Sequence, residues 1–324
     1  MRNVRYLYAN FGARSRNFGN LVIDYATRYL MRDEFPAAAA EFDSFDRKIP
    51  LGSYDFVLVP GGTMITAGQN PGLEHIEQLG CPVYCLAGSL WTSTASPGLL
   101  LRKRVIRFRQ PPMVDLRIVR KMTPPVGCRD RFTYELLRAE GIESYYTGCP
   151  TLMLPDDGVA DDGYVLMSLG RGFVRTQTRY AARLARRHHI VGIVHEVDDY
   201  QRFRAAGWKL PLVTYCGDLD LYLSYFKRAA VVVSGRLHGV LPALGYDKPV
   251  FYYGTRDTRT TILDDLGVPV HSYREIFEAV DRASRYSNRH LLRHFRSNWD
   301  RVVQAIAARH LAPASQVRSK GATI

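Results

Sequence analysis

Short apolar runs of strand length alternate with segments of helical period along most of the sequence, and this alternation limits the fold more than any other feature. Val4–Ala9, Asp55–Pro60 and Pro82–Ala87 have the length and composition of buried strands. Between residues 21 and 30, apolar side chains recur instead with the spacing of a helix. Strands that alternate with helices predict βαβ units and parallel sheets.

A polar, acidic and turn-rich stretch at residues 155–163 interrupts this alternation, which then restarts with Tyr164–Leu169. The chain has 324 residues, a length that suits two domains. We therefore predict an α/β protein with two Rossmann-like, doubly wound domains that face a cleft, at residues 1–155 and 163–310, and a flexible tail at 311–324. Because ligands of such sheets bind beyond the carboxyl ends of the strands, the residues that follow strands are the site candidates.

Charge and cysteine content narrow the class of protein. The formal net charge is +13, which favours an anionic partner such as a phosphorylated small molecule, a nucleic acid or an acidic membrane surface. Hydrophobic residues make up 46% of the chain, which excludes a disordered protein. The five cysteines are scattered, and no apolar run has the length of a signal peptide or of a membrane span. We therefore expect a cytoplasmic protein without disulfides.

The strongest group of chemically competent residues follows the apolar run Val231–Val233. The segment Ser234–Gly239 brings Arg236 and His238 to the first turn of the next predicted helix. Arginine offers a planar fork of donors that matches phosphate or carboxylate. Histidine is the side chain best suited to proton transfer near neutral pH. We interpret the pair as catalytic, the alternative being a capping histidine and a surface arginine.

Further candidates for substrate binding lie at other strand ends, where a helix N-terminus can offer backbone N–H groups to an anion. These candidates are Asn17, Gly61, Gly62, Arg129, Arg171 and His195. The alternatives are ordinary turns for the glycine-containing loops, a salt bridge between Arg129 and Asp130, and a purely structural His195. No set of residues demands a metal ion.

Together these motifs resemble the polysaccharide pyruvyl transferase family. The similarity spans residues 6–275 and includes the segments 17–20, 61–62 and 129–142. Its most specific part is Ser234–Leu244, followed by Lys248-Pro249-Val250. The chain has Gly19-Asn20 where the family often has Gly-Asp, and it has Cys149-Pro150 near the place of a frequent Asp-Pro pair.

The resemblance implies the two-domain arrangement of GT-B glycosyltransferases, with the acceptor on the side of the N-terminal domain and the donor on the C-terminal domain. It implies a transferase that moves pyruvate from phosphoenolpyruvate onto a sugar diol of a glycan or lipid-linked precursor, in exopolysaccharide or cell-envelope biosynthesis. The product is a cyclic ketal, phosphate is released, and no cofactor is needed beyond this co-substrate. Arg236 and His238 match the family's Arg-x-His pair. We expect Arg236 to bind the donor's phosphate or carboxylate with help from Arg171, and His238 to act as general acid or base.

Two other functions agree with the sequence. A GT-B-like glycosyltransferase that uses a nucleotide sugar would need a similar cleft. A non-catalytic polyanion-binding protein would use the basic segment 102–121 and the last predicted helix, 288–310. No nucleic-acid-binding module is recognisable. We therefore expect the basic segments to meet an anionic membrane surface, at its inner face, or an acidic glycan.

Overall fold

The computed structural model describes residues 4–10, 17–35, 37–44, 48–50, 52–63, 71–90, 116–170, 172–254, 257–272, 275–276, 280 and 289–311. The first half of the chain forms a parallel sheet in two ladders, ordered β2-β1-β3-β5 and β4-β6-β7-β8. Only two residues lie between β3 and β4, and two between β5 and β6. The second ladder is therefore a continuation of the same sheet. The strands are β1 (Tyr6–Asn10), β2 (Ala40–Asp43), β3 (Phe56–Val59), β4 (Gly62–Thr63), β5 (Val83–Cys85), β6 (Gly88–Ser89), β7 (Val126–Cys128) and β8 (Ser144–Tyr146).

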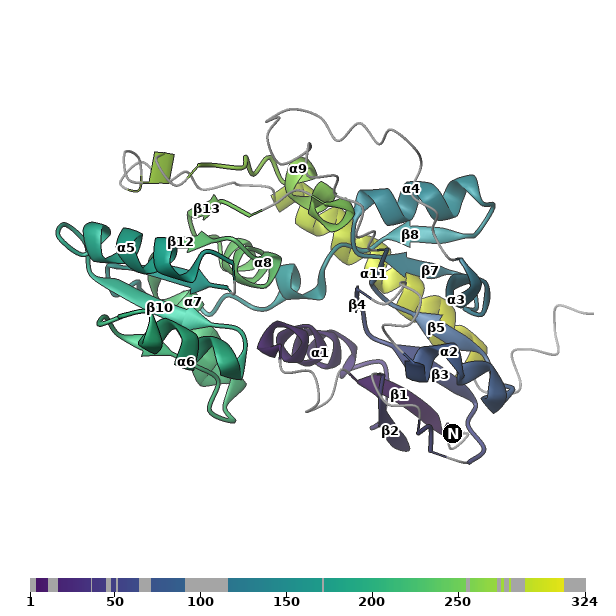
Figure 1. The fold of residues 1–324 in the computed structure, drawn as a ribbon. Helices are drawn as coiled ribbons and strands as arrows, with labels where there is room; N and C mark the ends of the chain where they lie inside the picture. The colour runs from purple at the N-terminus through teal and green to yellow at the C-terminus, as the bar shows by residue number, and fades with distance from the viewer. Residues whose placement is uncertain are drawn as a thin grey trace, which may run out of the picture.

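The second half forms a parallel sheet ordered β11-β10-β9-β12-β13. The strand order reverses between β9 and β12, which is the position where doubly wound sheets bind ligands. The strands are β9 (Tyr164–Leu169), β10 (Ile190–Val194), β11 (Leu212–Val213), β12 (Ala229–Ser234) and β13 (Val250–Tyr252). The helices are α5 (Val174–Leu184), α6 (Val197–Ala205), α7 (Leu219–Lys227) and α8 (Leu237–Gly245). The predicted α/β class with two Rossmann-like sheets is confirmed (Figure 1).

Residues 155–163 connect the two halves without helix or strand. The remaining helical segments are α1 (Phe18–Met31), α2 (Pro71–Glu74), η1 (Ile76–Leu79), α3 (Arg117–Arg120), α4 (Arg131–Ala139), η3 (Pro150–Met153), η4 (Thr258–Thr260), α9 (Thr261–Asp265) and α11 (Arg289–His310). None of the helices in the described ranges combines the length and the low polarity needed to cross a bilayer.

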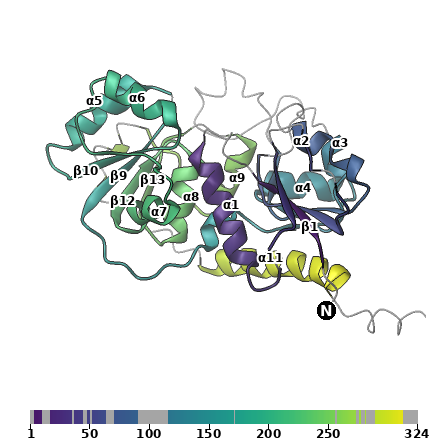
Figure 2. The same cartoon turned by 90° about the horizontal axis from the view of Figure 1, so that it is seen from below.

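Helix α1 follows the first strand in sequence but lies between the two sheets (Figures 1 and 2). It packs against α8 of the second domain and against η3. Its Tyr25 hydroxyl donates to Asp220 Oδ1 at 2.6 Å, which links α1 to the start of α7. One apolar core is therefore continuous from the first sheet through α1 to the second sheet.

Helix α11 packs against the first sheet, although the sequence analysis assigned residues 163–310 to the C-terminal domain (Figure 2). The Phe295 ring lies 4.8 Å from the Tyr146 ring, and Asn298 donates to the Tyr146 carbonyl at 2.9 Å. Trp299 is buried in the same cluster as Phe56. The predicted boundary differs from the structure here because an apolar stripe identifies a helix without indicating which sheet it covers. Residues 312–324 of the predicted tail lie outside the described residues.

Candidate active site between the two domains

His238 lies in the first turn of α8, directly after β12. The backbone turns at Gly235, where a β-carbon would lie 2.6 Å from the Tyr253 ring. The N–H of Arg236, the N-cap residue of α8, then donates to Ser234 Oγ at 3.0 Å. This tight turn carries Arg236 and His238 together to the side of the second domain that packs against α1.

The start of α1, from the first domain, contacts His238 directly. Asn17 caps α1, and its Oδ1 accepts the N–H of Gly19 at 3.1 Å. The same oxygen lies 3.1 Å from Nδ1 of His238. A β-carbon on Gly19 would lie 2.0 Å from that nitrogen, so this approach requires a glycine. The structure therefore brings together two predicted site residues that are 221 positions apart.

This contact fixes the proton on the His238 ring. Because Asn17 Oδ1 already accepts from Gly19, the atom facing His238 is an acceptor. Nδ1 of His238 must then carry the hydrogen and donate it to Asn17. In the neutral ring the other nitrogen, Nε2, keeps its lone pair. His238 is thus arranged to accept a proton at Nε2.

The surroundings of His238 keep the ring neutral. Burial lowers the pKa of His238 well below its ordinary value of 6.5. The positive charges of Arg236, Arg129 and Arg259 lower this pKa further. Arg259 was not among the predicted site residues, and it is held by Asp257, whose Oδ1 lies 3.1 Å from its Nε. A resting imidazole in this field serves as a base rather than as an acid.

Arg236 is held by two carboxylates at the start of α6. Its Nη2 donates to Glu196 Oε1 at 2.5 Å, and its Nη1 lies 3.6 Å from Asp199 Oδ2. Both carboxylate residues are buried. The charge of Arg236 is therefore balanced within the protein. Sequence reasoning missed Glu196, although its position directly after a strand and next to His195 was an available signal.

His195 lies behind His238 and is fully buried. Its Nε2 is 2.6 Å from Ser168 Oγ and its Nδ1 is 3.1 Å from the Tyr222 hydroxyl. Burial lowers the pKa of His195 well below the usual value, so this ring is also neutral. Its backbone carbonyl accepts the N–H of Phe18 from α1 at 2.7 Å. In this structure, the predicted ligand-binding residue His195 joins the two domains and does not line the pocket.

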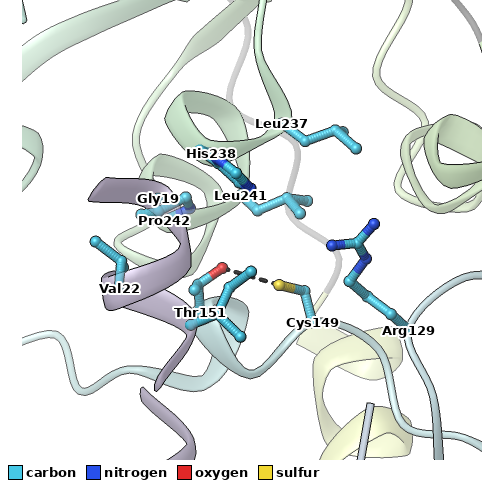
Figure 3. A pocket seen from close by; sticks show the side chains of 10 residues that line it. Gly19, Val22, Arg129, Cys149, Thr151, Leu237, His238, Leu241 and Pro242 are labelled. Atoms are coloured by element: carbon cyan, nitrogen blue, oxygen red, sulfur yellow. Dashed lines mark hydrogen bonds between the residues drawn. The ribbon is translucent and has the colours of Figure 1, made fainter. Parts of the chain in front are cut away.

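A pocket lies beside His238, lined by Gly19, Arg129, Cys149, Thr151 and Leu237 among others (Figure 3). Arg129 comes from the first domain, directly after β7, and its guanidinium points into the pocket. Its Nη2 donates to Ser89 Oγ at 3.0 Å, whereas its Nε has no hydrogen-bond partner among the described residues. Burial lowers the pKa of Arg129 and raises that of the Cys149 thiol, which therefore stays protonated.

The other residues predicted for the site either do not line this pocket or lie outside the described residues. Gly61 and Gly62 have φ angles of +156° and +112°, and a β-carbon on Gly61 would lie 2.8 Å from the Ala87 carbonyl oxygen. These glycines let β3 and β4 run close to β5 and β6. Arg171 lies outside the described residues. Within the described ranges, no three His, Cys, Asp or Glu side chains are grouped so that they could hold a metal ion.

The family model described as polysaccharide pyruvyl transferase matches residues 5–257. The chain belongs to this family. The predicted resemblance is therefore confirmed, and the protein is a transferase of the polysaccharide pyruvyltransferase type. No curated protein is significantly similar to the chain in sequence.

Solved structures support the two-domain fold. The UDP-GlcNAc 2-epimerase of Methanocaldococcus jannaschii, in complex with UDP-GlcNAc and UDP, has 12% identity and a TM-score of 0.54, with 94% of this chain and 99% of that chain covered. The UDP-GlcNAc 2-epimerase of Neisseria meningitidis, bound to UDP-GlcNAc, has 11% identity and a TM-score of 0.56, with 94% and 98% covered. At these identities the similarity shows the fold alone, which is GT-B-like.

Proposed function

We propose that this pyruvyltransferase moves the pyruvyl group of phosphoenolpyruvate onto two hydroxyls of a glycan or lipid-linked sugar, forming a cyclic ketal and releasing phosphate. The observation that carries the proposal is the pocket in which His238 and Arg129 meet from opposite domains. One supplies a neutral base and the other a buried cation. The family match supports a pyruvyl donor and a glycan acceptor.

Arg129 is the residue that we assign to an anionic group of the donor. Its side chain is 2% exposed, and its hydrogen bond to Ser89 leaves most of its donors without a protein partner in the described residues. A buried guanidinium with unused donors is costly to desolvate, and a bound phosphate or carboxylate offsets that cost. Arg236 is already balanced by Glu196 and Asp199 and does not line the pocket, so in this proposal it is secondary to Arg129 in holding the donor. Arg171 remains a proposed second cation.

The proposed reaction begins when the enol carbon of phosphoenolpyruvate gains a proton. A sugar hydroxyl attacks C2, and Nε2 of His238 accepts the proton of that hydroxyl. Loss of phosphate leaves a cation at C2, which the second hydroxyl attacks to close the ring. The two hydroxyl protons balance the proton taken up at the enol carbon and the proton that leaves with phosphate. A base in this position contributes about 10²–10⁴-fold to the rate.

The test is to incubate the protein with phosphoenolpyruvate and a panel of free and lipid-linked glycans. We expect phosphate release that depends on both substrates, and an acceptor mass that increases by one pyruvyl ketal. His238→Ala should lower turnover by about 10²–10⁴-fold. The matched control is His290→Ala, which removes an exposed histidine of α11 and should leave turnover unchanged. Wild-type turnover in a folded His238→Ala variant would contradict the assignment. Nucleoside diphosphate release from a nucleotide sugar would instead favour a glycosyltransferase.

A further inference from the structure

The solvent face of α5 and of the turn after it carries a run of arginines without acidic neighbours. Residues 163–195 contain no Asp or Glu. Arg175 and Arg179 are exposed one turn apart on α5, and Arg186 is exposed in the turn that follows the helix. Gln177 and Leu184 are buried on the opposite side. None of the three arginines forms an ion pair with a described residue.

An exposed aromatic side chain stands at the beginning of this helix. Phe173 is 75% exposed and has a left-handed backbone with φ 59°, which is unfavourable for a residue with a β-carbon. Hydrogen bonds nevertheless hold the described residues on either side of this position. Gln177 donates to the carbonyls of Gly170 and Gly172, and its Oε1 accepts from the Tyr253 hydroxyl at 3.0 Å. The start of α5 thus presents a large apolar ring to solvent.

Several basic side chains on other surfaces form contacts within the protein. Arg120 pairs with Glu140 and Lys121 with Glu77, and residues 102–115 lie outside the described part of the chain. On α11, Arg296 pairs with Asp300 at 3.0 Å, and Arg301 and Arg309 lie over tyrosine rings. The expected membrane contact through 102–121 and the last helix stays a prediction beside the surface that α5 offers.

We propose that Phe173, Arg175, Arg179 and Arg186, here named the α5 surface, dock on a bilayer with anionic headgroups. Arginines beside an exposed ring fit such an interface, because the cations meet headgroups while the ring enters the acyl boundary. A soluble polyanion would use the charges but would not use the ring. A β-carbon on Gly170, which precedes Phe173 by three residues, would lie 3.2 Å from Cδ of Arg236, so the start of the α5 surface is close to the loop that carries Arg236.

The experiment is co-sedimentation with vesicles of phosphatidylcholine alone or with added phosphatidylglycerol. The wild-type protein should sediment only with the anionic vesicles. Each arginine near an anionic surface strengthens binding about fivefold, so Arg179→Glu/Arg186→Glu should weaken binding by at least about 25-fold. Phe173→Ser should weaken it by about tenfold, as expected for one aromatic ring no longer leaving water. The charge-matched control is Arg289→Glu/Arg293→Glu on the exposed face of α11, which should bind like wild type.

Circular dichroism and thermal unfolding first confirm that each variant is folded. Failure of the wild-type protein to sediment with anionic vesicles would overturn the proposal, as would an equal loss in the α11 control. Unchanged binding of Phe173→Ser, together with displacement by soluble heparin, would identify a general polyanion surface and would also overturn it. Because vesicle binding is measured without either substrate, its failure is distinguishable from failure of the proposed reaction.

Discussion

Replacing Asn17 with Asp would change the charge beside His238 while preserving the local structure. Asp is as good an N-cap residue as Asn, and its carboxylate can still accept the N–H of Gly19. The helix dipole of α1 favours a negative charge at this end. The group 3.1 Å from Nδ1 of His238 would then be a carboxylate in place of a neutral amide oxygen.

The size of the effect follows from the surroundings of the imidazole. In the wild-type protein, burial and then the neighbouring arginines hold the pKa of His238 well below its ordinary value. An opposite charge at contact distance shifts a pKa by about 1–3 units, and here the carboxylate of Asn17→Asp shifts the pKa of His238 upward. A base must be deprotonated to accept a proton. The acid limb of the profile of kcat/KM against pH should therefore move to higher pH by the same amount.

The assay is phosphate release from phosphoenolpyruvate from acidic to alkaline pH, with a saturating acceptor. Asn17→Asp should match wild type at alkaline pH and lose activity as the pH falls. Ionisation of the donor contributes equally to both proteins, so it cancels in the comparison. Asn17→Ser is the matched control, because serine also caps a helix but adds no charge, and its acid limb should not move upward. An unmoved limb in folded Asn17→Asp would refute the role of His238 as the base.

Two further predictions test the same region. Gly19→Ala places a methyl group 2.0 Å from Nδ1 of His238, so turnover should fall at least about tenfold. This loss is expected even though alanine favours a helix over glycine by about 1 kcal/mol. Wild-type turnover with unchanged thermal unfolding would contradict the prediction. Burial holds the pKa of His195 well below 6.5, so the unfolded chain takes up the proton first. Stability should be constant above about pH 6.5 and fall below it by about 1.4 kcal/mol per pH unit for this histidine. Thermal unfolding at pH 7 and pH 5 should reveal the decrease, and His195→Gln should reduce it; an equal decrease in His195→Gln would exclude His195 as its source.

The periodicity of the sequence was sufficient to predict the elements and their class, because strand and helix patterns are local. Val231–Val233 and Tyr164–Leu169 lie in β12 and β9 as expected. The place of α11 could not be predicted. Its buried residues, such as Trp299 in the core of the first sheet, are apolar side chains that would suit either sheet. Residues at the end of a sequence carry no local signal for the domain to which they return.

Some features of the candidate site could likewise be predicted from local sequence, and others could not. Arg236 and His238 could be found from their position after a strand, because that position is a local property. The contact between Asn17 and His238 depends on how two domains pack, and the carboxylates that hold Arg236 depend on the register of β10 beside β9. Neither follows from residue spacing. The sequence also could not show whether His195 lines the pocket. In the structure both of its ring nitrogens lie within hydrogen-bond distance of Ser168 and Tyr222 instead.

The arginines around His238 give the proposed donor a second effect. Arg236, Arg129 and Arg259 lower the pKa of His238, so its imidazole is a weak base. An anionic donor bound beside these guanidiniums would cancel part of their field. The pKa of His238 would then rise, and Nε2 would become more basic only while the donor is in place. In the proposed reaction a hydroxyl would therefore be deprotonated most readily in the presence of the donor, which would couple donor binding to the attack by the acceptor.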